Sequence, residues 1–110
     1  MSTLYKRYEI NRANINDVSN LITDGDYLID LRSQNEFKEA RLPNSINVPF
    51  LQVGDWVKKN IKNYSAKIFL YCQNGARSVH AAATLRKMGY TNIIDLGGLN
   101  AYNGELVGEK

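Results

Sequence analysis

The chain has 110 residues, of which 44% are hydrophobic and 23% charged, and its formal net charge is +3, which is typical of one globular domain spanning residues 1–110. The positive charges are scattered and form no stripe interleaved with aromatic residues, so we expect no nucleic-acid binding. The sequence has no signal peptide, no apolar run of membrane-spanning length and only one cysteine, so we expect no membrane association and a reducing, cytoplasmic location.

The apolar pattern predicts strands that alternate with helices along the chain. Ser33 with Glu36 three residues later predicts a capping box at one helix start, and Gly54 is a candidate break in a later helix. Gly97 and Gly98 predict a tight turn, and the tail from residue 104 onward is expected to fray. The predicted strands are residues 5–10, 27–31, 45–48, 68–71 and 92–96, and the predicted helices are residues 14–22, 34–40, 50–64, 76–88 and 99–102.

Alternation of this kind predicts an α/β fold with a mostly parallel sheet. In such sheets ligands bind beyond the carboxyl ends of the strands, so the residues that follow strands should gather at one edge. Asp30, Arg32 and Cys72 all occupy such positions. We favour ion pairing with neighbouring loops over a role in substrate binding for Asp30 and Arg32, because charges at strand ends commonly pair.

Cys72 lies between the apolar strand at 68–71 and the helix predicted over 76–88. The first amides of a helix lack intrahelical partners and carry partial positive charge, so they favour a thiolate, which is the nucleophilic form of cysteine. Gly75 permits unusual backbone angles in the loop, and Arg77 adds a full positive charge. A lone cysteine is more often a small buried hydrophobe, but this combination favours a thiolate beside anion-binding groups.

At these residues the chain resembles the single-domain form of the rhodanese family. No one segment is decisive, and the order and spacing of the segments carry the resemblance over about residues 14–107. The matching segments are Tyr-Leu-Ile-Asp-Leu-Arg at 27–32, Glu-Phe at 36–37, Arg-Leu-Pro-Asn-Ser-Ile-Asn-Val-Pro at 41–49, Ile-Phe-Leu-Tyr-Cys-Gln-Asn-Gly-Ala-Arg-Ser at 68–78, residues 85–90 and Leu-Gly-Gly-Leu at 96–99.

The resemblance implies a sheet of about five strands with helices on both faces. It also implies a thiosulfate sulfurtransferase that needs neither a cofactor nor a metal. In that role Cys72 would take sulfane sulfur from a donor such as thiosulfate or a persulfide, hold it as a persulfide, and pass it to cyanide, a small thiol or a protein acceptor. The substrate-binding cradle would comprise Gln73, Asn74, Gly75, Ala76, Arg77 and Ser78.

Two segments depart from the family pattern. The family often has Gly-His-Ile-Pro-Gly-Ala after its Glu-Phe pair, whereas residues 40–45 here read Ala-Arg-Leu-Pro-Asn-Ser, so any role of that histidine is absent. A tryptophan common after the Gly-Gly pair is replaced by Tyr102. Both differences look structural and lie outside the proposed chemistry.

Three other functions remain open. Cysteine-dependent phosphatases and arsenate reductases resemble this arrangement, but they place five residues between cysteine and arginine, whereas four separate Cys72 from Arg77. Non-catalytic rhodanese-like modules bind or regulate other proteins, and they often lack the cysteine. An exposed thiolate could also serve a redox role, although no second cysteine is present to resolve a sulfenic acid. We expect His80 to face solvent, since no other Cys or His supports a metal site.

Overall fold

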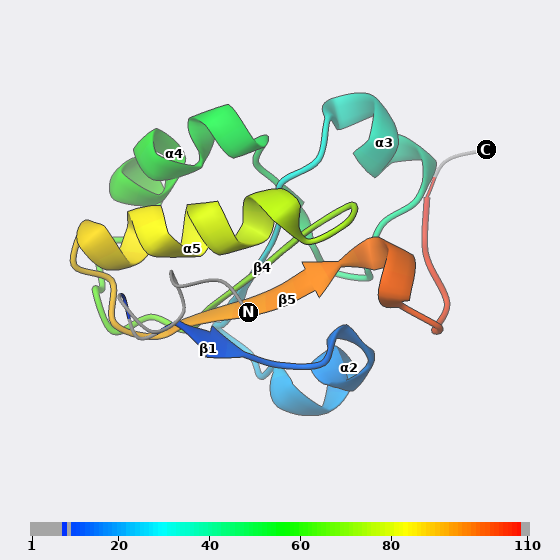
Figure 1. Ribbon diagram of the computed structural model, residues 1–110, viewed down its shortest axis with the longest axis horizontal. Helices are drawn as coiled ribbons and strands as arrows, with labels where there is room; N and C mark the ends of the chain where they lie inside the picture. Colours follow the sequence, from blue (N-terminus) through cyan, green and yellow to red (C-terminus); the bar gives the residue numbers. More distant parts are fainter. Residues whose placement is uncertain (1–7, 9, 109–110) are drawn as a thin grey trace.

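A five-stranded parallel sheet lies at the centre of the molecule, with helices on both of its faces (Figure 1). The computed structural model describes residues 8 and 10–108. The strands are β1 (Asn11–Arg12), β2 (Tyr27–Asp30), β3 (Ile46–Asn47), β4 (Ile68–Cys72) and β5 (Ile93–Gly98), in the spatial order β1-β5-β4-β2-β3. The α-helices are α2 (Val18–Leu21), α3 (Gln34–Glu39), α4 (Val53–Asn60) and α5 (Ala76–Lys87), and the 3₁₀ helices are η1 (Ile15–Asp17), η2 (Phe50–Gln52) and η3 (Leu99–Ala101).

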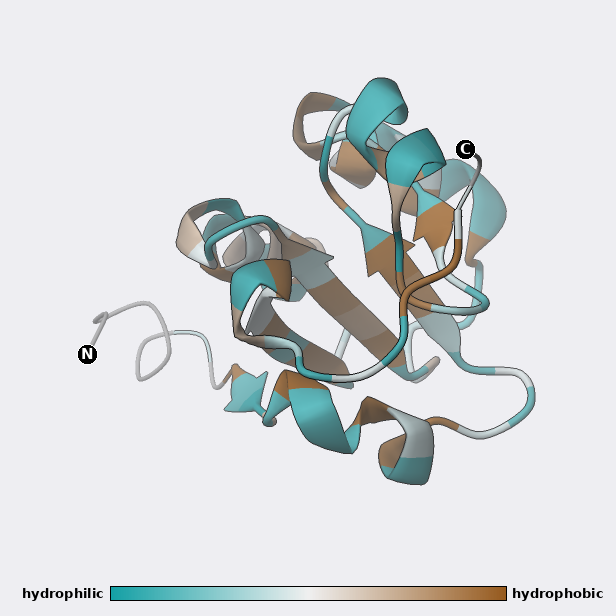
Figure 2. Cartoon of the chain, turned by 90° about the vertical axis from the view of Figure 1, so that its right-hand side faces the viewer, coloured by the Kyte–Doolittle hydropathy of each residue, from teal (hydrophilic) through white to brown (hydrophobic). Residues whose placement is uncertain are grey.

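β4 is the central strand, and every one of its residues is buried. Its side chains alternate between the two faces of the sheet, as the pleat of a strand requires. Ile68, Leu70 and Cys72 belong to the core that packs against α4 and α5. Phe69 and Tyr71 belong to the core on the opposite face, which contains residues of η1, α2 and η3. Figure 2 shows hydrophobic residues along the strands of the sheet.

The predicted α/β class and mostly parallel sheet are confirmed. The capping box at the start of α3 is present, since the Ser33 side chain accepts from the Glu36 amide while the Glu36 carboxylate accepts from the Ser33 amide. The strand predicted at 5–10 falls largely outside the described residues, and β1 follows it directly. Every helix within the described part of the chain is too short or too polar to cross a membrane.

Three local predictions are wrong. The helix predicted over 50–64 is divided into η2 and α4 directly before Gly54, and α4 ends at Asn60, several residues before the predicted end at 64. Gly97 and Gly98 are not a turn but the last residues of β5, where a shift of register leaves Leu96 without a partner on β4. The tail does not fray throughout, because the backbones of Val107 and Arg41 exchange hydrogen bonds of 2.8 and 2.9 Å.

Gly54 is the second residue of α4, where alanine would reduce the conformational entropy of the unfolded chain relative to glycine. A Cβ at this position would lie 3.6 Å from the Met88 sulfur and 3.8 Å from Thr84 Cγ2, which are ordinary contacts. We therefore expect Gly54→Ala to raise the free energy of unfolding by about 0.5–1 kcal/mol. Chemical denaturation followed by circular dichroism measures this change, and a loss of stability would show that the contact with α5 is tighter than these distances indicate.

Candidate active site at the end of β4

Cys72 is the last residue of β4, and it pairs with Gly98 at the end of β5. Its position on the α5 side of the sheet brings the sulfur beneath the loop that leads into α5. The residue is 3% exposed. A reactant must therefore enter a hollow in the surface to reach the sulfur.

The loop directs one backbone amide at this sulfur. The Gly75 amide donates a hydrogen bond of 3.1 Å to Cys72 Sγ. Gly75 has φ +88°, a left-handed conformation that a residue with a Cβ adopts only at a cost. The Ala76 amide donates instead to Asn74 Oδ1 at 3.1 Å. Within the described residues, the loop thus offers one direct amide donor to the sulfur, and a glycine in the left-handed conformation orients it.

A hollow of about 290 Å³ opens beside the sulfur. Both arginines expected near this edge, Arg32 and Arg77, contribute to its wall. Of the six predicted cradle residues, Gly75 and Ser78 do not line it. The Gly75 amide donates to the cysteine sulfur. Ser78 is fully buried, and its hydroxyl donates to the Gly75 carbonyl. The lining residues are Leu31, Arg32, Glu36, Cys72, Gln73, Asn74, Ala76 and Arg77.

Arg77 lies in the first turn of α5, and its side chain is exposed. The guanidinium carbon is 5.7 Å from the centre of the Phe50 ring, a distance at which an arginine and an aromatic face attract each other. Glu36 contributes a negative charge to the same wall, although one of its carboxylate oxygens accepts from Ser33 at the start of α3. The hollow therefore has one exposed positive and one exposed negative group at its rim.

Asp30 and Arg32 form an ion pair with each other, with 2.7 Å between Arg32 Nη2 and Asp30 Oδ2. Ion pairing at this strand end is thus present, but the two residues pair with each other and not with a neighbouring loop. Burial would lower the pKa of Arg32, whereas the hydrogen bonds and the charge of Asp30 raise it, and the net direction is upward. The sequence predicts that Arg32 and Cys72 meet at one edge of the sheet, and both line the hollow. The contact between Arg32 and Gln73 is not predicted, since no local pattern relates residue 32 to the loop at 73–77.

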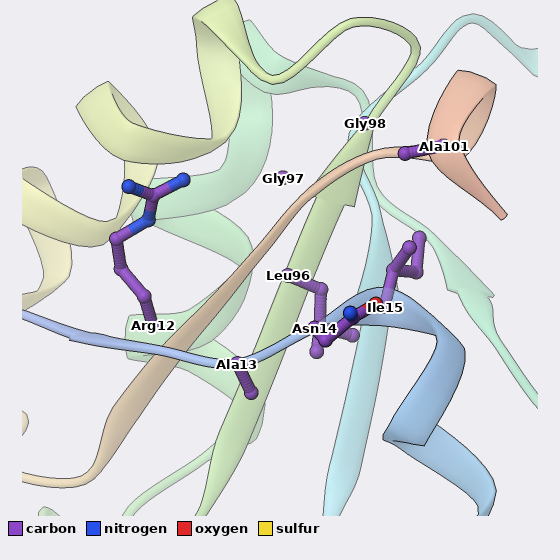
Figure 3. Close-up of a pocket in the computed structure, with 8 residues that line it drawn as sticks. All are labelled: Arg12, Ala13, Asn14, Ile15, Leu96, Gly97, Gly98 and Ala101. Carbon is purple, nitrogen blue, oxygen red and sulfur yellow. The ribbon is translucent and has the colours of Figure 1, made fainter. Parts of the chain in front are cut away.

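A second hollow, of about 480 Å³, lies against the edge of the sheet formed by β1 and β5 (Figure 3). It is lined by Arg12, Ala13, Asn14, Ile15, Leu96, Gly97, Gly98 and Ala101. None of these residues has a nucleophilic side chain, so the smaller hollow beside Cys72 is the candidate site. His80 is exposed and does not line either of these hollows, as expected. Tyr102 packs half-buried against the core that contains η1 and η3, which is a structural role.

The end of β5 supports the loop through direct backbone contact. A Cβ on Gly98 would lie 2.7 Å from both Cα and the carbonyl carbon of Asn74, closer than real Cβ contacts occur. The Asn100 amide donates a hydrogen bond of 3.0 Å to the Gln73 carbonyl, which ties the loop to η3. Gly98 is therefore needed for the approach that places the Gly75 amide on the sulfur.

Because the clash at Gly98 involves backbone, we expect Gly98→Ala to displace the loop and to lower the free energy of unfolding by about 1–3 kcal/mol. The alkylation rate of Cys72, followed by mass spectrometry against pH, should change in the folded variant because the amide no longer reaches the sulfur. Gly54→Ala is the matched control, since the same substitution there meets only ordinary contacts. An unchanged alkylation profile in Gly98→Ala would contradict this account of the loop.

A parallel α/β sheet with a cysteine at the end of its central strand, in front of a helix, is the arrangement expected for a rhodanese-like domain. The rhodanese-like domain family model matches residues 14–105, and the chain belongs to that family. It is 39% identical over 84 residues to Bacillus subtilis "Uncharacterized protein YqhL", covering 76% of this chain and 65% of the relative. It is 27% identical over 74 residues to Escherichia coli "Thiosulfate sulfurtransferase PspE", covering 67% of this chain and 71% of the relative.

The fold is also that of solved rhodanese-like domains. The solution structure of the rhodanese-like domain of the Anabaena protein Alr3790 superimposes with a TM-score of 0.78 at 17% identity, covering 89% of this chain and 79% of that one. The chain spans only part of the length of some relatives. Its match to a Thermoplasma acidophilum tRNA sulfurtransferase covers 12% of that protein.

Proposed function

We propose that this chain is a sulfurtransferase that carries sulfane sulfur as a persulfide on Cys72. The observation that supports this most directly is the 3.1 Å hydrogen bond from the Gly75 amide to the cysteine sulfur, at the wall of a hollow that also contains Arg77. Relatives named thiosulfate sulfurtransferase, tRNA sulfurtransferase, and adenylyltransferase and sulfurtransferase support the same reaction class.

In the first half of the proposed reaction, the Cys72 thiolate attacks the outer sulfur of thiosulfate. A new bond forms between Sγ and that sulfur, the S–S bond of thiosulfate breaks, and sulfite leaves with the bonding electron pair. In the second half, cyanide or a thiolate attacks the outer sulfur of the persulfide. The Sγ–S bond then breaks, thiocyanate or a new persulfide leaves, and Cys72 regains its thiolate. Neither half requires a metal or an external oxidant.

The chain's own groups fit the charges in this scheme. The Gly75 amide donates to Sγ, so it stabilises the thiolate that attacks and the thiolate that is released. Arg77 draws the thiosulfate dianion toward the hollow. The loop has four residues between Cys72 and Arg77, and only the Gly75 amide of the described loop bonds the sulfur. Such a loop suits one added sulfur better than a phosphoryl group, which needs donors for several oxygens.

The acceptor class follows from the same hollow. Cyanide and a small thiol fit into about 290 Å³, and a protein thiol reaches Cys72 only from a segment that projects into the hollow. We propose a thiol, of low molecular weight or on a protein, as the acceptor in the cell. The presence of Cys72 weighs against a purely non-catalytic binding module.

The first test is sulfur loading of the intact protein. Because Cys72 is the only cysteine, thiosulfate should add the mass of one sulfur atom to the wild type and none to Cys72→Ser. Thiocyanate release in the presence of cyanide should disappear in the same variant. His80→Ala, an exposed change on α5 that does not line the hollow, serves as the control and should load normally.

Loading that persists in Cys72→Ser would overturn the proposed nucleophile. Hydrolysis of an aryl phosphate by the wild type, with no sulfur loading under the same conditions, would instead assign the chain to phosphatase chemistry.

The two charged groups at the rim should have opposite effects on thiosulfate. We expect Arg77→Ala to raise the KM for thiosulfate roughly fivefold, the effect of about 1 kcal/mol for a partly exposed charge. Glu36→Gln should lower this KM because it removes a negative charge while glutamine retains the capping-box role. Initial rates of thiocyanate formation at several salt concentrations measure both effects. The charge account would be wrong if the two variants shifted KM in the same direction.

A further inference from the structure

The guanidinium of Arg32 has one side that the protein saturates. Its Nε donates to both carboxylate oxygens of Asp30 at 3.1 Å. Its Nη2 donates to Asp30 Oδ2 at 2.7 Å and to the Ala40 carbonyl. The hydrogens on these nitrogens thus have acceptors, and they hold the planar group in one orientation.

The other side of the guanidinium is not saturated. Nη1 carries two hydrogens, and within the described residues it has one acceptor, Gln73 Oε1, at 3.5 Å. That distance lies beyond the usual range of 2.7–3.2 Å for such a bond. Both Arg32 and Gln73 line the hollow beside Cys72. Nη1 is therefore an oriented donor at the wall of the hollow, with hydrogen-bonding capacity left over.

We propose that Arg32 Nη1 donates a hydrogen bond to an oxygen of the sulfonate group of the sulfur donor, which makes Arg32 a specificity-determining residue for donors that carry such a group. This inference rests on the sulfurtransferase function proposed above. In this arrangement the sulfonate oxygens lie toward Arg32, and the sulfane sulfur lies toward Cys72 Sγ. The bond that breaks, between the sulfane sulfur and the sulfonate sulfur, is then directed away from the nucleophile.

The roles of the two arginines differ because their charges are compensated differently. Asp30 is fully buried and paired with Arg32, so this pair contributes little net attraction at long range. Arg77 is exposed, and its charge acts from the rim. Arg77 therefore gathers the dianion, whereas Arg32 fixes its orientation through a hydrogen bond that Asp30 has preorganised. The contribution of Arg77 should fall with ionic strength, and that of Arg32 should depend little on it.

Donors that lack a sulfonate group set the limit of this preference. An alkyl persulfide also transfers its outer sulfur to Cys72, releasing an alkyl thiol, but it offers no sulfonate oxygen to Nη1. The proposal therefore predicts that Arg32 matters for thiosulfate and is nearly irrelevant for a small alkyl persulfide. A purely structural role of Arg32 would affect both donors equally.

Arg32→Lys is the discriminating variant, because lysine keeps a positive charge beside Asp30 and loses the Nη1 donor. We expect kcat/KM for thiosulfate to fall by about ten- to a hundredfold, as expected for a lost hydrogen bond to a charged group. The rate of Cys72 loading by a small alkyl persulfide should stay within about twofold, so the ratio of the two rates is the readout. The salt dependence for thiosulfate should remain as in the wild type.

Arg41→Lys is the matched control. Arg41 lies over the Phe37 ring, its Nη1 donates to the Phe37 carbonyl, and it does not line the hollow. It should leave both donors unaffected. Equal losses for the two donors in Arg32→Lys, or no loss for thiosulfate, would overturn the proposal. Normal persulfide loading in that variant keeps the sulfurtransferase function intact, whereas absence of loading in the wild type with either donor would refute that function separately.

A binding measurement tests the contact without turnover and without altering Arg32. The Cys72→Ser protein, which lacks the nucleophile, is titrated with inorganic thiosulfate while the arginine side chains are followed by nitrogen-15 NMR. The Arg32 guanidinium signals should shift together with those of Arg77. Shifts confined to Arg77 would show that the dianion binds at the rim alone, and the proposal would fail.

Discussion

The packing of the 73–75 backbone against Gly98 sets the position of the cysteine sulfur. β4 and β5 end side by side, with Cys72 opposite Gly98, and the loop after β4 turns back over the end of β5. A side chain at residue 98 would occupy the space of Asn74. The left-handed Gly75 then aims its amide at Sγ. Gly98 at the end of β5 and Gly75 in the loop after β4 therefore set the position of the amide that bonds the sulfur, independently of any charged residue.

Charge in the hollow is arranged in two layers. The buried Asp30–Arg32 pair is neutral as a unit, and hydrogen bonds to the carboxylate and to the Ala40 carbonyl hold it rigidly. The exposed Arg77 and Glu36 have opposite signs at the rim. A neutral buried pair avoids most of the cost of burying a lone charge, yet it still presents an oriented N–H donor. Long-range attraction and local orientation are consequently separable properties of this hollow.

The sequence predicts those features that depend on residues close together along the chain. The capping box of Ser33 and Glu36, the buried β4 and the helix after Cys72 all follow from local patterns, and the structure contains each of them. The turn predicted at Gly97 and Gly98 is wrong because a Gly-Gly pair is compatible with a turn and with a strand that follows a bulge, and only the register against β4 distinguishes them. The strand pattern places Arg32 at the same edge as Cys72, but its contact with Gln73 and the bridge between Arg41 and Val107 join distant segments that no local pattern relates. The predicted cradle was likewise broader than the set of residues that face the hollow, since helix geometry turns Ser78 inward.

In the proposed cycle both the donor and the acceptor must reach one sulfur atom through one hollow of about 290 Å³. Cys72 is 3% exposed, so its sulfur has no second broad face from which an acceptor could approach while sulfite is still bound. In this cycle we therefore expect sulfite to leave before the acceptor enters, with the sulfur held as a persulfide in the interval between them. The same restricted access limits which thiols reach the outer sulfur during that interval, since a protein thiol reaches it only from a segment that projects into the hollow. The buried position of Cys72 thus favours a carrier that alternates between two stable forms over an enzyme that holds both substrates at once.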